Sequence, residues 1–249
     1  MGTLQVGHGS EFHLLRFLGR HRELLNSRLE TQLAADGVEQ VASVEWLDFP
    51  FKPAAPTRDG EILSVDFLAD HGGAAWQSFW PDPESGKFNR RGMPSWDAVG
   101  HVRFKGSSRK EWLLVEAKAH TKEFSSPGAA CGAAGRSRQS ITEALRSTFG
   151  ALCPKQVRNW ESFQDQWLGQ YYQLANRLAV LHFLNACELP ARLLYVLFAG
   201  DQYRICPPTS LSWSKLFTSA YREMGLELDH PLSSRCHRLC LHVKSGERV

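Results

Sequence analysis

Several features are absent from this sequence of 249 residues, and each absence narrows the class of protein. No apolar run is long enough to cross a lipid bilayer, and residues 1–5 lack the basic and apolar regions of a signal peptide. An excess of one charge is also lacking: the net charge is +3 and the pI is about 8.5. This balance allows nucleic-acid binding without requiring it. We therefore expect a cytoplasmic protein with no membrane partner.

A disulfide framework and a paired zinc motif are lacking too. The six cysteines are scattered without a CxxC pair, which indicates reduced thiols in a protein of this size. Cys236, His237, Cys240 and His242 are residue types that bind zinc, but the usual spacing of two ligand pairs is missing. Apolar and polar residues alternate over 238–243, as in a strand. The sequence therefore favours a strand here over a structural metal site.

The order of the remaining segments predicts the fold class. No internal repeat is evident, so we expect a single α/β domain over 1–249 with loop insertions near 70–93 and 122–138. An alternating order of helices and strands predicts a mixed central β-sheet flanked by helices. The expected elements are a helix over 11–35, strands over 41–48 and 62–68, a hairpin over 97–105 and 111–120, helices over 140–149 and 166–187, a buried strand over 193–198, a helix from Ser210 or Ser212 to about 224, and a strand over 238–243.

The hairpin carries the clearest functional pattern. Side chains alternate between the two faces of a strand, so Glu116 and Lys118 project together from one face while Ala117 projects from the other. If 106–109 forms a four-residue turn, Lys105 pairs with Lys110, and Asp97 lies opposite Lys118 with Val99 opposite Glu116. A carboxylate from each strand and one ammonium group then converge on one face of the sheet. A shift of the register by one residue would separate them.

This set of residues suits phosphoryl chemistry. Two carboxylates, Asp97 and Glu116, can hold Mg²⁺ or Mn²⁺ while leaving coordination positions for water and a phosphate. The carbonyl of Ala117, between the two key side chains of its strand, can complete the metal shell. Lys118 can orient or deprotonate the attacking water, or stabilise the transition state electrostatically. We therefore expect a metal-dependent catalytic site at the hairpin.

A family resemblance appears at the same residues. The segment Pro94-Ser95-Trp96-Asp97, followed by Leu114-Val115-Glu116-Ala117-Lys118, resembles the PD-(D/E)XK nuclease superfamily, and the likeness extends from the first helix to about Phe198. The sequence departs from the family pattern because Ser95 and Trp96 separate Pro94 from Asp97. The resemblance implies a restriction-endonuclease-like core and Mg²⁺-dependent hydrolysis of phosphodiester bonds, usually in DNA, during restriction, repair or defence.

The resemblance also implies helpers from neighbouring helices. An additional acid would come from the first helix, where Glu23 and Glu30 are the candidates and Glu23 is preferred. A polar residue would come from the helix that follows the hairpin. That helix has a polar stripe at helical spacing, and Gln170 and Gln173 are the residues that we select. The stripe comprises Gln166, Gln170, Gln173 and Arg177.

Basic residues gather around the hairpin and the segment that follows it. Beside a phosphate-handling site they can neutralise the nucleic-acid backbone, whereas elsewhere they are ordinary solubilising charges. We select five of them as candidate nucleic-acid contacts: Lys105, Arg109, Lys122, Arg136 and Arg138.

Other interpretations stay open on the sequence alone. Glu116 and Lys118 can form the solvated face of an edge strand, and Trp96 can be a core residue or a stacking surface for a base. The chain can also be a non-catalytic nucleic-acid-binding or assembly module with the same fold, or an enzyme that cleaves RNA. No helix-turn-helix or zinc-finger reader is visible, so specificity would come from loops, from a partner protein or from a homodimer.

Overall fold

A five-stranded mixed sheet forms the centre of the computed structural model, which describes residues 8–47, 62–63, 65–68, 79–80, 94–125, 130–153, 159–201, 207 and 209–245. The helices longer than one turn are α1 (Ser10–Arg20), α2 (Arg22–Ala35), α5 (Gly135–Leu152), α6 (Gln164–Leu168), α7 (Tyr172–Ala186) and α8 (Ser210–Glu223). The strands are β1 (Val41–Trp46), β2 (Ile62–Leu63), β3 (Ser95–Trp96), β4 (Ala98–Phe104), β5 (Lys110–Lys118), β6 (Ala191–Ala199) and β7 (Cys236–His242). The short elements are α4 (Thr121–Phe124) and the 3-10 turns η1 (Asp66–Leu68), η3 (Trp160–Ser162) and η4 (Ser233–Arg235).

The polarity of the sheet changes at β5. The strand order is β1-β4-β5-β6-β7. The β1–β4 and β4–β5 pairs are antiparallel, whereas β5–β6 and β6–β7 are parallel. Parallel neighbours need a crossover connection, and α7 lies on the path from β5 to β6. A separate two-stranded sheet pairs β2 with β3, just before β4 begins. The expected α/β fold with a mixed sheet and flanking helices is confirmed.

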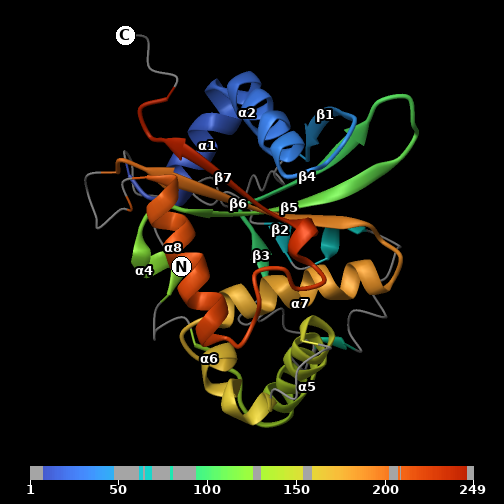
Figure 1. Ribbon diagram of the computed structural model, residues 1–249, viewed down its shortest axis with the longest axis vertical. Helices are drawn as coiled ribbons and strands as arrows, with labels where there is room; N and C mark the ends of the chain where they lie inside the picture. The colour runs from blue at the N-terminus through green and yellow to red at the C-terminus, as the bar shows by residue number, and fades with distance from the viewer. Residues whose placement is uncertain are drawn as a thin grey trace, which may run out of the picture.

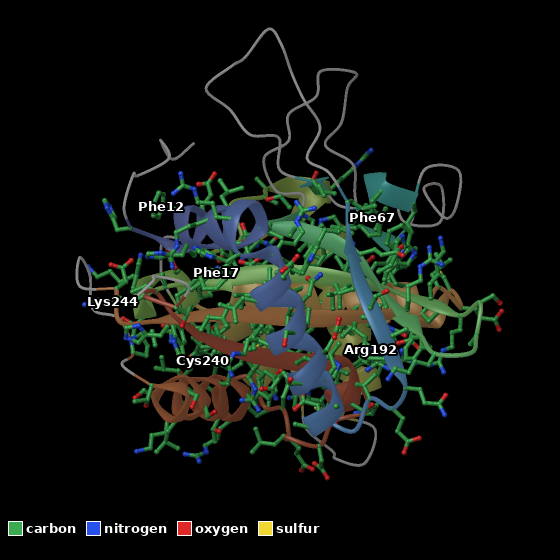
Figure 2. The ribbon with its side chains drawn as sticks, turned by 90° about the horizontal axis from the view of Figure 1, so that it is seen from above. Phe12, Phe17, Phe67, Arg192, Cys240 and Lys244 are labelled. Atoms are coloured by element: carbon green, nitrogen blue, oxygen red, sulfur yellow. The ribbon has the colours of Figure 1, made fainter. Side chains whose placement is uncertain are left out.

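Helices cover both faces of the sheet (Figure 1). On one face, α1 and α2 pack their leucines and Phe17 against Val115, Ala117 and Phe198. On the other face, α5 to α8 pack against Leu114 and Leu193. Figure 2, viewed from the side of α1 and α2, shows these two helices lying over the sheet, with Arg192 and Lys244 at opposite ends of the sheet. All nine residues of β6 are buried, as its nearly all-apolar sequence predicts for a strand covered on both sides.

Two helices that the sequence predicts as continuous are each divided in two. The segment 11–35 breaks at His21, whose φ of −129° is not helical, and α1 and α2 then follow the sheet in different directions. The segment 166–187 breaks after α6, where Gly169 has φ −104° and ψ −115°. Apolar spacing continues across both breaks, so periodicity alone does not reveal them.

Other boundaries also differ from the prediction. The helix expected over 140–149 extends over Gly135–Leu152, and α4 ends at Phe124, so the two ends of the loop expected near 122–138 are helical. Of the described residues in the strand expected over 62–68, Ile62–Leu63 alone form a strand, and Asp66–Leu68 form the 3-10 turn η1. Most of the insertion near 70–93 lies outside the described residues, apart from 79–80. None of the helices in the described part of the chain is long and apolar enough to span a membrane.

Candidate active site

The candidate site lies at the C-terminal end of β5, the end far from the hairpin turn, on the face covered by α7. Glu116 and Lys118 project from this face, whereas Val115 and Ala117 pack into the opposite core. Both charged side chains are buried, with 4% of Glu116 and 7% of Lys118 exposed. β5 is paired on both sides, by β4 and by β6, so Glu116 and Lys118 do not belong to a solvated edge strand. The predicted alternation therefore places this carboxylate and this ammonium together in the interior.

Asp97 joins them from the bend between β3 and β4. Its Oδ2 accepts a hydrogen bond of 2.7 Å from the Ala117 N–H, and its own N–H donates to the Val115 carbonyl at 3.1 Å. The aspartate side chain thus accepts the hydrogen bond that a backbone carbonyl of β4 would accept if the β4–β5 ladder continued past Ala98 and Val115. This contact fixes the carboxylate next to the Glu116–Lys118 strand segment.

The register of the hairpin differs from the predicted one by two residues. Arg103, not Lys105, pairs with Lys110, and Val99 pairs with Leu114 instead of Glu116. The same offset places Asp97 level with Glu116, not with Lys118. The connection is longer than four residues because the Lys105 N–H donates to the Gln40 carbonyl instead of to β5. An offset of two preserves the face of every side chain, so the predicted convergence holds although the predicted register is wrong.

Glu116 is the centre of a buried ion-pair network. Its Oε1 lies 2.5 Å from the Lys118 Nζ. Its Oε2 accepts from Arg177, at 2.8 Å from Nε and 2.7 Å from Nη2. Burial alone would raise the pKa of Glu116, but the positive charges of Arg177 and Lys118 outweigh it and lower that pKa below its usual range. Glu116 is therefore ionised and fully paired.

Asp97 is in a different electrostatic state from Glu116. Burial, and then the neighbouring negative charge of Glu116, raise the pKa of Asp97 to about 7. Lys118, the Ala117 N–H and Arg177 act in the opposite direction without cancelling this rise. Two adjacent carboxyl groups thus have pKa values displaced in opposite directions, a pattern that is enriched at functional sites.

Helix α7 covers the site with polar side chains. Gln173 accepts a hydrogen bond of 3.1 Å from the Lys118 Nζ, as its selection from the polar stripe anticipated. Gln170 lies before α7 begins, and its side chain is hydrogen-bonded to Tyr171. One turn beyond Gln173, Arg177 enters the site. The stripe was therefore a useful signal, although Gln173 and Arg177, not Gln170 and Gln173, are the pair that contacts β5.

Arg177 is the member of this buried cluster that the sequence interpretation did not select. Its guanidinium lies 4.9 Å from the centre of the Trp96 ring and donates to the Asn176 Oδ1 at 2.7 Å. Trp96 is fully buried, so it is a core residue that supports Arg177 and not an exposed stacking surface. The available signal was the four-residue spacing from Gln173, which places both residues on one helix face.

The remaining predicted helpers lie away from this centre. Glu23 is exposed and Glu30 is partly buried on α2, which packs on the opposite face of the sheet. The structure therefore does not bring either acid to Asp97 and Glu116. Because α1 and α2 share that face, an acid on either helix reaches the site only around the end of the sheet.

The selected basic residues fall into two groups. Lys122 and Arg136 are exposed on α4 and at the start of α5, on the stretch of chain that follows Lys118. Arg138 is exposed nearby and donates to the Cys131 carbonyl at 3.1 Å. Lys105 and Arg109 lie at the tip of the hairpin, about 20 Å along β5 from Glu116 at 3.3 Å per residue. The first group therefore follows the site in the chain, whereas the second lies at the other end of β5.

The donor set fits a divalent metal bound through few protein ligands. Mg²⁺ is usually held by one or two carboxylates and retains several waters. Asp97 and Glu116 supply two carboxylates, and the Asp97 Oδ1 accepts no hydrogen bond from the described residues. The Ala117 carbonyl points to the same edge as its N–H, toward Asp97. Within the described ranges, no cluster of three or more His, Cys, Asp and Glu side chains could hold a metal ion.

The zinc alternative near the C-terminus is not supported. Residues Cys236–His242 form β7, as their alternation predicts. His237 lies between the Asp36 Oδ2, 2.8 Å from its Nδ1, and the Arg192 Nη1, 3.1 Å from its Nε2. Both ring nitrogens of His237 are therefore engaged by neighbouring side chains.

Comparison with protein-family models, with curated proteins and with solved structures finds no match to this chain. The functional argument therefore depends on the site itself.

Proposed function

We propose that this protein is a Mg²⁺-dependent nuclease of the PD-(D/E)XK type that hydrolyses phosphodiester bonds in DNA. The observation that carries the proposal is the convergence of Asp97, Glu116 and Lys118 on one face of β5, at the point where the sheet changes polarity. The order of elements, with a hairpin followed by a helical crossover to a parallel strand, is compatible with a restriction-endonuclease-like core. When bound, Mg²⁺ would neutralise charge on the scissile phosphate and lower the pKa of a water molecule.

The side chains around the carboxylates have distinct roles in this proposal. Lys118 has three N–H donors, and the described residues use two of them, through Glu116 and Gln173. The third can bind a phosphate oxygen, so Lys118 stabilises developing negative charge and does not need to act as a base. Gln173 fixes the orientation of the ammonium group.

The basic residues extend the site into a phosphate-binding surface. Lys122 and Arg136 would contact phosphates near the cleaved bond. Lys105 and Arg109, about 20 Å away along β5, would contact the backbone roughly six base pairs further on at 3.4 Å per base pair. Arg109 is partly committed, because it pairs with the buried Glu111.

The second candidate is a nucleic-acid-binding or assembly module without catalysis. One observation favours it: both oxygens of Glu116 are already paired with Lys118 and Arg177, so the carboxylate needs no metal to be stable in the interior. The two proposals differ in one measurable property, because only the nuclease requires a divalent metal at Asp97.

The deciding experiment measures cleavage of plasmid, linear and single-stranded DNA, and of RNA, with Mg²⁺ or Mn²⁺. We expect metal-dependent cutting of DNA by the wild type and a loss of about 10²–10³-fold in Lys118→Ala, since one electrostatic group in such a site contributes about this factor. Lys215→Ala, at an exposed lysine of α8, is the matched control and should cut normally. An inactive wild type on all substrates would favour the binding module, and preferential cutting of RNA would correct the substrate.

A further inference from the structure

Arg177 occupies the position at which a metal ion would meet Glu116. The guanidinium binds the Glu116 Oε2 through two of its nitrogens, and Lys118 binds the Oε1. Only 7% of Arg177 is exposed, so its charge is held inside the fold. These contacts use three of the roughly four lone-pair sites of the carboxylate. The two cations also repel an incoming divalent metal, so coordination of Glu116 favours displacement of one of them.

Arg177 is the more exchangeable of the two. Lys118 lies two residues from Glu116 on the same rigid strand, and Gln173 fixes its ammonium group. Arg177 reaches the strand from α7 and has two further partners, the Trp96 ring and the Asn176 Oδ1. These partners can retain the guanidinium after it leaves Glu116. The Asn176 amide and the Trp96 face thus form a second resting place for the same charge.

We propose that Arg177 is the resting counter-ion of Glu116, that a divalent metal displaces it, and that the released guanidinium then binds the scissile phosphate. This inference depends on the proposed nuclease function and names how its site is held closed before metal binds. A planar guanidinium with several N–H donors matches a phosphate in the same two-point geometry in which it binds a carboxylate.

The test measures Mn²⁺ binding without nucleic acid, by calorimetry and by the magnetic-resonance signal of free Mn²⁺. Arg177→Met removes the charge and keeps an apolar chain against Trp96. We expect it to bind Mn²⁺ at least about tenfold more tightly than the wild type, which is within the range that groups around metal ligands produce. Arg177→Lys retains a positive charge and should stay within about threefold of the wild type. Asp97→Asn removes a proposed ligand and should bind least.

A second variant guards against loss of folding in Arg177→Met. Asn176→Leu keeps Arg177 but removes the carbonyl that orients its Nη1. Because Asn176 retains the displaced guanidinium in this proposal, the variant should bind Mn²⁺ more weakly than the wild type, by about threefold. In cleavage assays, Arg177→Met should lose about 10²-fold in kcat despite its tighter metal binding. A merely structural arginine would not produce this opposite movement of metal affinity and kcat.

The outcomes separate this inference from the proposed function. Asp97-dependent Mn²⁺ binding by the wild type, with unchanged or weaker binding in Arg177→Met and unchanged or tighter binding in Asn176→Leu, would overturn the role of Arg177 and leave the nuclease proposal in place. Absence of Mn²⁺ binding in the wild type and in every variant would overturn the metal-dependent function, and the inference with it.

Discussion

Strand β5 carries a buried carboxylate near each of its ends, and the two are built differently. Glu111, near the start of β5, points toward α2 and is completely buried. It is paired with Arg109, with Arg192 at 2.5 Å and with Arg235 at 2.9 Å. Glu116 points to the opposite face, toward α7, and is paired with Lys118 and Arg177. Both carboxylates are fully neutralised, so burial and pairing alone do not distinguish them.

The difference lies in the neighbours. Among the described residues no second acid shares the arginines of Glu111, and the network continues from Arg192 through His237 to Asp36. It joins β5, β6, β7 and the end of α2. Glu116 instead has Asp97 beside it, a carboxyl group whose pKa is raised to about 7 by burial and by Glu116 itself. In a structural ion cluster, cations neutralise every carboxylate. A catalytic candidate also contains a carboxyl group whose ionised form is destabilised.

The strongest test of this comparison is the free energy of unfolding of Glu111→Gln and Glu116→Gln. Removal of the Glu111 charge leaves Arg192 buried without its carboxylate, so we expect a loss of about 3 kcal/mol in urea denaturation. Glu116→Gln should lose only about 1–2 kcal/mol, because it also relieves repulsion with Asp97. The order of effects on cleavage should be the reverse: folded Glu111→Gln should retain activity, and Glu116→Gln should lose it. A larger stability loss in Glu116→Gln would contradict the division of roles.

Asp97→Asn sharpens the comparison through its pH dependence. The pKa of Asp97 is about 7 in the fold and about 3.9 in an unfolded chain. Ionisation is therefore harder in the folded state, and this residue lowers wild-type stability progressively as the pH rises from about 4 to about 7. The variant retains an acceptor for the Ala117 N–H and should be more stable at pH 8 by about 1–2 kcal/mol.

At pH 4 the Asp97→Asn variant and the wild type should have nearly equal stability, because the wild-type carboxyl group is then protonated. Asp165→Asn, at an exposed position of α6, is the control and should follow the wild type at every pH. Equal stability of Asp97→Asn and the wild type at pH 8 would show that Asp97 is not destabilised.

The smallest expected effect concerns the hydrogen bond from α7 to Lys118. Gln173→Ala removes the acceptor 3.1 Å from the ammonium nitrogen and should lower kcat by about fivefold, the equivalent of one modest hydrogen bond. Gln170→Ala, three residues earlier and outside α7, should leave kcat unchanged. The comparison is made in steady-state cleavage assays, and equal effects of the two substitutions would remove the positioning role of Gln173.

Much of the site follows from the sequence because side chains alternate strictly along a strand. Glu116 and Lys118 must share a face, and the turn near Gly106 returns Asp97 to that face even when the register changes by two. The register itself was not predictable, since Lys105 bonds to Gln40, far away in the sequence. Arg177 was hidden for a related reason: a polar helix residue has the same local pattern whether it meets solvent or a buried carboxylate.

The breaks at His21 and Gly169 show the same limit at the level of the fold. Apolar spacing determines which helix faces are buried, and Leu29 and Leu178 on these helices are both completely buried. Where a helix bends depends on the surface it must follow. Tertiary packing determines that surface, and local helix propensity carries no information about it.

The hydrogen bonds of the two clusters also differ in how far apart their partners lie in the chain. Asp97 and Ala117 are 20 residues apart, Glu116 and Arg177 are 61 apart, and Glu111 and Arg192 are 81 apart. Asp36 and His237 are separated by 201 residues. Contacts between distant residues carry the larger loop-closure cost. During synthesis Asp97 and Glu116 can therefore meet within one hairpin. The ion-pair network of Glu111, at the other end of β5, is complete only after β7 has left the ribosome.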